Sequence, residues 1–213
     1  MRSPARSKLE PRKLPRQERS HEMVERILGT ARQLSREIGF RGVSTAQIAQ
    51  HAGLSVGSIY QYFPNKEAIM VELTRRWLAQ FQPIVEHARA RPRPRTWRAL
   101  EATLAELFDR ADRLYREAPD MLAVLELMAA SPELRGVEET HDRAIIASFS
   151  RWLREINPEL PEAAATRLGE LILAVGHVCL KASAAGPPAR GRLIREDLKA
   201  MMQALLRPQV GLR

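Results

Sequence analysis

The sequence predicts an all-α protein of about nine helices, three in an N-terminal domain and six behind it. Hydrophobic residues make up 45% of the 213 residues, whereas aromatic residues make up only 5%. The apolar positions are therefore mostly Ala, Leu, Ile and Met, and they recur at the three- and four-residue spacing of an amphipathic helix. The sequence has no internal repeat, and its length allows one large domain or two modest ones.

Residues 44–66 predict two short helices joined by a tight turn. Ser44 or Thr45 can cap the first helix, because either hydroxyl accepts a hydrogen bond from an unpaired backbone N–H. Gly53 follows where the first helix needs a left-handed residue, and Ser55 can cap the second helix. Two short helices joined in this way are typical of a helix-turn-helix unit, whose second helix enters the major groove of DNA.

A helix from Ser20 to Ile38, closed by Gly39, precedes this pair. It is expected to form the floor on which the pair packs, because two short helices alone bury too little apolar surface to persist. Together these segments predict a helix-turn-helix DNA-binding domain over residues 19–66, followed by a second helical domain over residues 67–213.

Between about residues 20 and 70 a set of residues lies at fixed spacings: Gly39-Phe40, Ser44-Thr45, Ile48-Ala49, Ala52-Gly53-Leu54-Ser55, Gly57-Ser58-Ile59-Tyr60, Tyr62-Phe63 and Lys66-Glu67. Through these residues the chain resembles the N-terminal domain of the tetracycline-repressor family. Beyond residue 70 the resemblance is one of helical layout alone.

The resemblance also implies which residues hold DNA phosphates. Thr45, Tyr60, Tyr62 and Lys66 match family positions that contact phosphate oxygens, and we group Ser44 with them. The family often has His where this chain has Tyr62, and both side chains can donate to a phosphate. The alternative for Tyr60 is an aromatic wedge between helices, and for Lys66 a solvated residue in the first turn of its helix.

The second short helix offers candidates for base reading. Its first turn holds Val56, Gly57 and Ser58, in the position that enters the major groove. Gly57 lets the backbone approach closely, Val56 suits a thymine methyl group, and Ser58 offers a hydroxyl. Gln61, one turn along, can pair bidentately with adenine and is the candidate for base discrimination.

The distribution of charge agrees with a nucleic-acid partner. The formal net charge is +9, and residues 1–66 hold 12 Lys/Arg against 5 Asp/Glu, whereas residues 67–213 hold 22 against 20. A basic segment raises the rate and the non-specific affinity of association with nucleic acid. Residues 1–18, rich in Pro and Arg, are expected to be a disordered basic arm, which is either a tether along the DNA or a frayed terminus.

Pro and capping residues delimit the expected helices of the second domain. Asn65 caps a helix to about Ala88 that Pro83 kinks or ends early, and Asp120 caps a short helix after Pro119. The other helices are expected over residues 96–117, 132–156, 161–185 and 190–206.

By the family resemblance, residues 67–213 bind a small-molecule effector and form a homodimer. The apolar types of the candidate pocket residues suit a largely apolar effector, although each alone also fits an ordinary core. These candidates are Trp77, Phe81, Leu104, Phe108, Met121, Leu125, Met128, Phe149 and Trp152.

The last two helices are the candidate dimer surface. Apolar residues occupy more than one side of the first of these helices, as expected if it packs both inward and outward. The candidate interface residues are Leu171, Ile172, Val175, Cys179, Ala182, Ile194, Leu198, Met201 and Leu205. The alternative is an ordinary intrachain core.

The sequence contains no motif of an enzyme, a cofactor site or a metal site. It lacks G-x-S-x-G, H-E-x-x-H, a Walker loop and a dinucleotide fingerprint, so no catalytic residue and no cofactor is expected. Two E-x-x-H matches, Glu18 to His21 and Glu138 to His141, lack the further ligands that a bundle metal site requires. His177 is expected to be a core or interface histidine.

A cytoplasmic protein is expected. The single cysteine, Cys179, allows no intrachain disulfide, which suits a reducing compartment. The N-terminal residues lack the apolar stretch of a secretory signal. The longest apolar run, Leu171 to Leu180, is shorter than the ~18–20 residues that span a bilayer.

The sequence therefore predicts a sequence-specific DNA-binding transcriptional regulator, a repressor that a small apolar effector releases from a palindromic operator. Two alternatives are a small-molecule binding module with a vestigial DNA-binding domain and a non-specific DNA-architectural protein. A footprint on the DNA that flanks its own gene separates the three. A discrete protected palindrome supports the regulator, diffuse protection the architectural protein, and no protection the binding module. The effector and the regulated genes are not encoded in any recognisable pattern.

Overall fold

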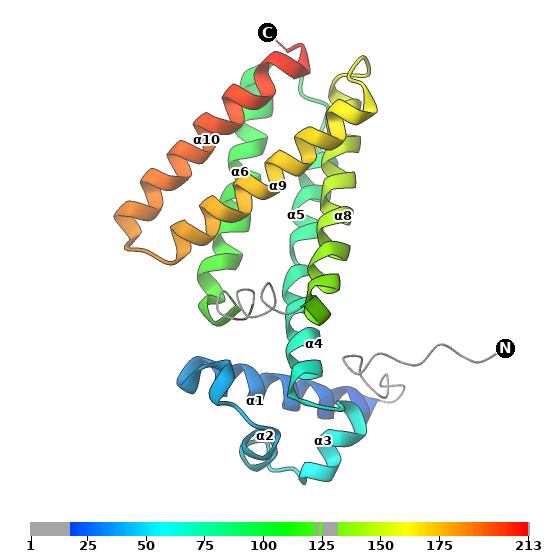
Figure 1. Cartoon of the computed structure of the whole chain (residues 1–213). Coiled ribbons are helices and arrows are strands. Elements are labelled where there is room, and N and C mark those ends of the chain that lie inside the picture. The colour runs from blue at the N-terminus through cyan, green and yellow to red at the C-terminus, as the bar shows by residue number, and fades with distance from the viewer. Residues whose placement is uncertain (1–17, 122–123, 125–131, 213) are drawn as a thin grey trace, which may run out of the picture. The chain divides into compact units, whose positions relative to one another are not determined.

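The computed structural model describes residues 18–121, 124 and 132–212, and these residues form helices and no strand (Figure 1). The predicted all-α fold is confirmed. Its helices are α1 (Glu18–Gly42), α2 (Thr45–His51), α3 (Val56–Tyr62), α4 (Lys66–Leu78), α5 (Phe81–Arg89), α6 (Trp97–Glu117), α8 (Pro132–Ile156), α9 (Glu162–Ala184) and α10 (Pro188–Val210).

The chain divides into two compact units. The head unit comprises the described residues of the ranges Met1–Trp77 and Asp120–Val137, and the rear unit those of the ranges Leu78–Pro119 and Glu138–Arg213. The division therefore falls eleven residues after the expected boundary at Lys66, because α4 packs with the head. The basic arm expected over residues 1–18 lies almost entirely outside the described residues.

The local signals of the head act as the sequence predicts. Ser44 forms a capping box with Gln47 at the start of α2, and Ser55 accepts from the backbone N–H of Ser58 at the start of α3. Gly53, between the two helices, has a φ of 61°, a conformation that disfavours any side chain with a Cβ. The turn between α2 and α3 is thus set by three residues that the sequence alone identifies.

The apolar core of the head fixes the orientation of its helices. Ile27 of α1, Ile48 of α2, and Ile59 and Phe63 at the end of α3 are all fully buried in one cluster. Gly39 interrupts α1 with a φ of 71° and a ψ of 148°, so the helix is broken near the expected position. Asn65 accepts from the backbone N–H of Ala68 and caps α4 as expected.

The helix expected from Asn65 to Ala88 is two helices. Pro83 lies in the first turn of α5, where its missing N–H and its ring exclude continuation from the preceding turn. The chain accordingly breaks at residues 79–80, between α4 and α5. The prediction that Pro83 ends the first helix early is confirmed.

Two other boundaries differ from expectation. The last helix begins at Pro188, not at Arg190, because Pro is favoured in the first helical turn. Asp120 was expected to cap a short helix, but residues 119–121 are themselves helical, so Asp120 lies within a helical turn and not at the position before it. Its carboxylate, 2% exposed, accepts from Arg32 and Arg36 of α1 at 3.0 and 2.9 Å. The rest of the expected short helix lies outside the described residues.

A buried carboxylate joins three helices of the rear unit. Asp112 of α6 is fully buried, accepts from Ser183 of α9 at 2.8 Å, and pairs with Arg195 of α10 at 3.3 Å. Arg116, one turn further along α6, pairs with the same carboxylate at 2.6 Å. A Cβ on Gly191 would lie 2.8 Å from the backbone oxygen of Ser183, so glycine is needed where α10 meets α9.

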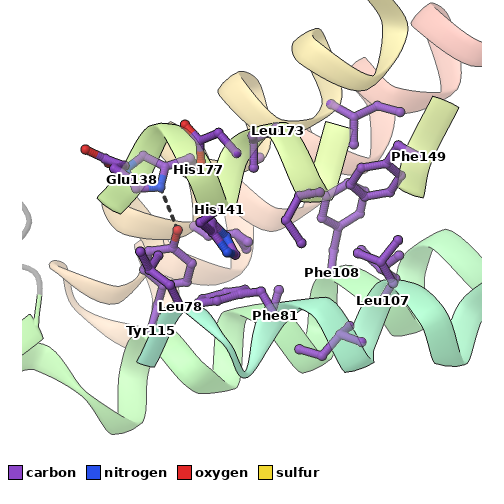
Figure 2. Close-up of a pocket in the computed structure, with 18 residues that line it drawn as sticks. Leu78, Phe81, Leu107, Phe108, Tyr115, Glu138, His141, Phe149, Leu173 and His177 are labelled. Atoms are coloured by element: carbon purple, nitrogen blue, oxygen red, sulfur yellow. Dashed lines mark hydrogen bonds between the residues drawn. The ribbon is translucent and has the colours of Figure 1, made fainter. Parts of the chain in front are cut away.

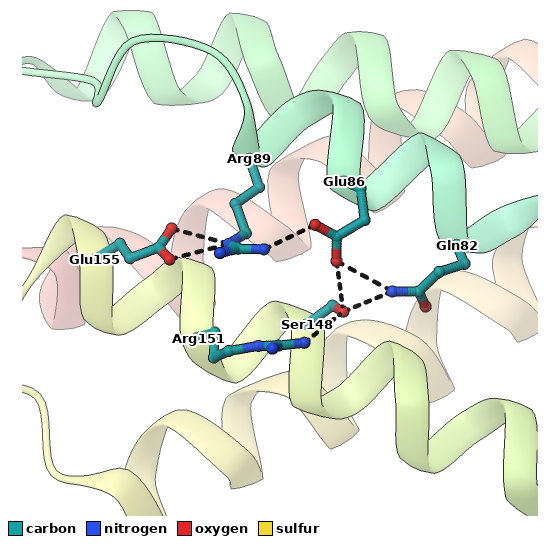
Figure 3. A network of polar contacts seen from close by, with 6 residues as sticks. All are labelled: Gln82, Glu86, Arg89, Ser148, Arg151 and Glu155. Atoms are coloured by element: carbon teal, nitrogen blue, oxygen red, sulfur yellow. Dashed lines mark hydrogen bonds and ion pairs between the residues drawn. The ribbon is translucent and has the colours of Figure 1, made fainter.

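A polar network joins α5 to α8 within the rear unit (Figure 3). Ser148 of α8, fully buried, donates to Glu86 of α5 at 2.9 Å and accepts from Gln82 at 2.7 Å. Arg89 pairs with Glu86 at 2.7 Å and with Glu155 of α8 at 2.9 Å. The hydroxyl of Ser148 is the main cause that lowers the pKa of Glu86, so the carboxylate stays ionised.

Helix α9 is the most apolar of the rear unit. By length and composition alone it could cross a bilayer, a test that core helices of soluble proteins also pass. Only 33% of its most apolar 18-residue window is buried in the described structure. The single chain therefore leaves apolar surface of α9 uncovered.

Replacing Asp112 with Ala is expected to lower the free energy of unfolding by about 3 kcal/mol, because Arg195 and Ser183 lose their buried partner. Urea or thermal unfolding measures the loss. Asp109→Ala is the control, since Asp109 lies on the same helix and its pair with Lys199 is 53% and 40% exposed. The control is expected to cost less than about 0.5 kcal/mol; equal losses would show that the buried pairing has no special weight.

Candidate functional site

The outer face of α3 is exposed while its inner face is buried. Val56 is 39% exposed and Tyr60 is 40% exposed, and Gln61 is also exposed, whereas Ile59 is fully buried. Because Ile59 and Phe63 anchor the helix in the core, the side chains of Tyr60 and Gln61 face outward. The candidate base-reading residues Val56, Gly57 and Gln61 therefore lie on an accessible surface.

Three of the hydroxyls expected to hold phosphates, those of Ser44, Thr45 and Tyr60, lie near the start of α2. Thr45 and Tyr60 lie 3.3 Å apart, oxygen to oxygen, which brings the beginning of α2 to the middle of α3. The hydroxyl of Ser44 is engaged in the capping box with Gln47. Ser58, half-buried, lies 2.8 Å from the hydroxyl of Ser55, so part of its hydrogen-bonding capacity is used locally.

Lys66 has a role inside the head that the sequence did not predict. Its ammonium donates to the carbonyl oxygens of Arg41 and Val43 at 3.3 and 3.1 Å, and it lies 5.4 Å from the centre of the Phe40 ring. An ammonium has three donors, so one remains for a phosphate. Lys66 thus secures the chain that leaves α1 and is not the solvated residue that the sequence left as an alternative.

Tyr62 is half-buried and packs against the apolar core of the head. Its ring is therefore held in place by the same cluster that anchors α3.

A cavity of about 60 Å³ lies within the rear unit, between α5, α6, α8 and α9 and the last residue of α4 (Figure 2). Three of the candidate pocket residues, Phe81, Phe108 and Phe149, line it. The candidates Trp77, Leu104, Met121 and Trp152 are buried but are not among the lining residues. Leu125 and Met128 lie outside the described residues.

Helical periodicity explains the difference. It identifies which side of a helix is buried, but it does not say which buried residues face a void and which face another helix.

One end of the cavity is polar, and sequence reasoning missed its role. Tyr115 of α6, Glu138, His141 and Asp142 of α8, and His177 of α9 line this end. The oxygen of Tyr115 lies 2.7 Å from Nδ1 of His177. The signal was present as the E-x-x-H spacing of Glu138 and His141, which places both side chains on one helix face.

Burial keeps the histidines and the tyrosine of this end neutral. It lowers the pKa of His141 to about 4 and also lowers the pKa of His177. It raises the pKa of Tyr115, and the carboxylates of Asp142 and Glu138 raise it further. With both groups neutral, the Tyr115 hydroxyl can donate to Nδ1 of His177.

The pKa values of the two carboxyl groups at this end are raised, whereas an ion pair lowers the pKa of an acid. Burial, followed by the charges of Glu138 and Glu139, raises the pKa of Asp142 to about 6. Burial also raises the pKa of Glu138, an effect that Lys181 opposes. The protein thus holds two carboxylates where their charge is costly.

The structure buries some residues of the candidate dimer surface and exposes others. Ile172 and Leu198 are buried inside the protomer at 1% and 0% exposure, so they belong to the core between α9 and neighbouring helices. Leu171 and Met201 are exposed, and Val175, Cys179, Ala182, Ile194 and Leu205 are partly exposed. Val178 and Leu193, which sequence reasoning missed, are the most exposed large apolar residues of the described chain, at 66% and 62%.

Comparison with known proteins agrees with this arrangement. A family model described as bacterial regulatory proteins of the tetR family matches residues 27–73, and one described as a tetracyclin repressor-like C-terminal domain matches residues 99–206. The chain is 27% identical to the HTH-type transcriptional regulator BetI of Cronobacter sakazakii over 175 residues, which cover 80% of this chain and 82% of that protein.

Solved structures show the same fold. A tetR-family transcriptional regulator from Streptomyces coelicolor matches with a TM-score of 0.69 and 20% identity, over 89% of this chain and 82% of that one. The SmeT–triclosan complex matches with a TM-score of 0.64 and 20% identity, over 86% of this chain and 90% of that one.

Replacing Asp142 with Asn is expected to stabilise the protein at neutral pH and to have no effect near pH 3.5. Because the pKa of Asp142 is raised to about 6 from its ordinary 3.8, ionisation costs stability as the pH rises between these values, and the full cost remains above pH 6. Asn carries no charge and avoids that cost, about 1 kcal/mol after allowance for solvent screening.

Urea unfolding of both proteins at the two pH values measures the effect. Asp197→Asn, at an exposed carboxyl group of α10, is the control and is expected to show no such pH-dependent gain. A stability difference that does not change with pH would contradict the proposed cost of ionisation.

Proposed function

Because the chain belongs to the tetracycline-repressor family and is a DNA-binding transcriptional regulator, we propose that it represses transcription until a small, largely apolar molecule enters the cavity of the rear unit. The observation that carries the proposal is the division of α3 into a buried face with Ile59 and an exposed face with Val56, Tyr60 and Gln61. A helix anchored in this way presents fixed side chains to a duplex.

On this proposal, base reading and phosphate holding are separate tasks. Val56, Gly57, Ser58 and Gln61 face the major groove, and Gln61 discriminates through a bidentate contact with adenine. The cluster of Ser44, Thr45, Tyr60, Tyr62 and Lys66 holds phosphate oxygens and fixes the register of α3 on the DNA.

The protein binds its operator as a homodimer through α9 and α10. The exposed apolar residues of the rear unit support this proposal, since Leu171, Val178, Leu193 and Met201 all lie on these two helices. A two-fold dimer reads two half-sites that are about 34 Å apart or a multiple of that distance, so the operator is palindromic.

The effector acts by shifting the population of two conformers. The cavity of about 60 Å³ is smaller than the ~300–1,000 Å³ of typical small-molecule sites, so a ligand must favour a conformer with a wider cavity. Leu78, the last residue of α4, lines the cavity, while Ala68 and Ile69 near the start of α4 belong to the core of the head. Helix α4 therefore contributes both to the core of the head and to the wall of the cavity. On this proposal, widening the cavity moves α4 and changes the spacing of the two DNA-binding heads of the dimer.

A footprint on the DNA that flanks its own gene tests the proposal. We expect one discrete protected palindrome and a cytoplasmic protein that releases it when the effector is added. A ligand that binds the free protein and the DNA complex equally tightly would contradict the release mechanism, because only a differential affinity shifts an equilibrium.

Gln61→Ala and Tyr60→Phe are expected to have different effects on DNA binding. Gln61→Ala removes the base contact, lowers affinity for the operator by about tenfold and leaves the affinity for scrambled sequences unchanged. Tyr60→Phe removes a hydroxyl directed at phosphate and weakens binding to both DNAs alike. Titration of operator and scrambled duplexes at a fixed salt concentration checks this, and a uniform loss from Gln61→Ala would refute its role in base reading.

Val178→Asp is expected to convert the dimer into monomers and to reduce operator binding at least about a hundredfold. The substitution places a charge at the most exposed large apolar residue of α9, where it loses its hydration if α9 is covered by a partner. Sedimentation velocity measures the oligomeric state. Ile38→Asp, at a residue of α1 that is 50% exposed, is the matched control and should remain dimeric; a dimeric Val178→Asp protein would place the interface elsewhere.

A further inference from the structure

Two carboxylates of the cavity wall form no ion pair within the described part of the chain. Glu138 and Asp142 are one helical turn apart on α8, both half-buried, and both line the cavity. Neither makes an ion pair or a side-chain hydrogen bond with another residue of the described chain. Like charges at this spacing repel each other, and a cavity wall provides less hydration than open solvent.

The rest of the wall does not compensate this charge. The lining residues include no Lys and no Arg, and both histidines of the lining are neutral, since burial lowers the pKa of each. Lys181 of α9 opposes the pKa shift of Glu138, but it does not line the cavity. The polar end therefore carries negative charge that a ligand can neutralise.

Aromatic rings border the same space. Phe81 and Tyr115 pack edge to face with their centres 5.4 Å apart, and His141 packs against Phe81 at 6.0 Å. Phe108 and Phe149 line the other, apolar end (Figure 2). The faces of such rings attract cations, and their area suits an apolar body.

We infer that the effector is an apolar molecule with one positive charge, a protonated lipophilic amine or a quaternary ammonium ion. Its charge lies beside Glu138 and Asp142, and its apolar body extends toward Phe108 and Phe149. This assignment rests on the proposed function of the cavity as the effector site and adds the chemical class of the effector.

The length of the wall sets the scale of the ligand. Glu138 and Phe149 both line the cavity and are eleven residues apart on α8, a distance of about 16 Å along the helix axis at ~1.5 Å per residue. A charged head joined to an elongated apolar body matches this separation of polar and apolar ends. A compact, evenly polar molecule does not.

Three compounds of one shape test the charge. They are 4-phenylbutylamine, 4-phenylbutanol and 5-phenylpentanoate, which carry a positive, a neutral and a negative group on the same phenylbutyl body. Titration calorimetry with the full-length protein, without DNA and near pH 8, gives the three affinities. We expect the amine to bind at least about tenfold more tightly than the alcohol and the carboxylate to bind most weakly.

A double substitution removes the charge and keeps the shape. In Glu138→Gln with Asp142→Asn, the affinity for the amine is expected to fall to that for the alcohol, while the affinity for the alcohol stays unchanged. Glu139→Gln is the matched control, since Glu139 is the exposed neighbour on the same helix and does not line the cavity. It removes one negative charge from the same helix and is expected to retain the preference for the amine. Circular dichroism and thermal unfolding establish that all variants are folded.

The outcomes separate this inference from the proposed function. An alcohol that binds as tightly as the amine, a preference that survives the double substitution, or an amine that fails to bind overturns the assignment of a cationic effector. The operator footprint needs none of these compounds, so a protected palindrome with no cation preference refutes the effector class and leaves the regulator intact. A protein that protects no DNA refutes the regulator whatever the cavity binds.

Discussion

The burial of Ile59 and Phe63 beneath α3 is the interaction on which the DNA-binding surface depends. Each side chain removes enough apolar area from water to stabilise the head by about 2 kcal/mol. Because the two residues are four apart and both fully buried, they fix the rotation of a seven-residue helix that could not persist alone. The exposure of Val56, Tyr60 and Gln61 follows directly, so the surface that α3 presents is a consequence of core packing.

The sequence predicts well those parts of the fold that depend on neighbouring residues. The caps at Ser44 and Ser55, the left-handed turn at Gly53 and the break before Pro83 are each set within one turn of helix, and all are present. Ile172 and Leu198 were predicted to lie on a dimer surface, but both are buried within the chain. The prediction failed because α9 and its neighbours are apolar on more than one side. Periodicity then cannot say which side faces the partner.

The candidate sites were harder to predict because they depend on contacts between distant residues. Lys66 donates hydrogen bonds to two carbonyl oxygens that are 23 and 25 residues earlier in the chain. No local sequence pattern reveals these contacts. Glu138 and Asp142 lie in a stretch of α8 that is rich in charged residues, so the sequence does not distinguish them from solvent-exposed acids. Only the fold brings them to a cavity that aromatic rings of α5 and α6 also line.

The contrast between two acids of the rear unit agrees with the proposed role of the cavity as the effector site. Asp112 is fully buried and surrounded by Arg116, Arg195 and Ser183, so its charge is compensated and it holds three helices in one arrangement. Asp142 is less buried but uncompensated, so its charge weakens the arrangement in which it lies. A ligand that supplies the missing charge gains most from a conformer in which it can reach Asp142, and that difference in affinity is what shifts a population. On the proposed function, Asp112 therefore stabilises one arrangement of the rear unit, whereas Asp142 makes the cavity responsive to a positively charged ligand.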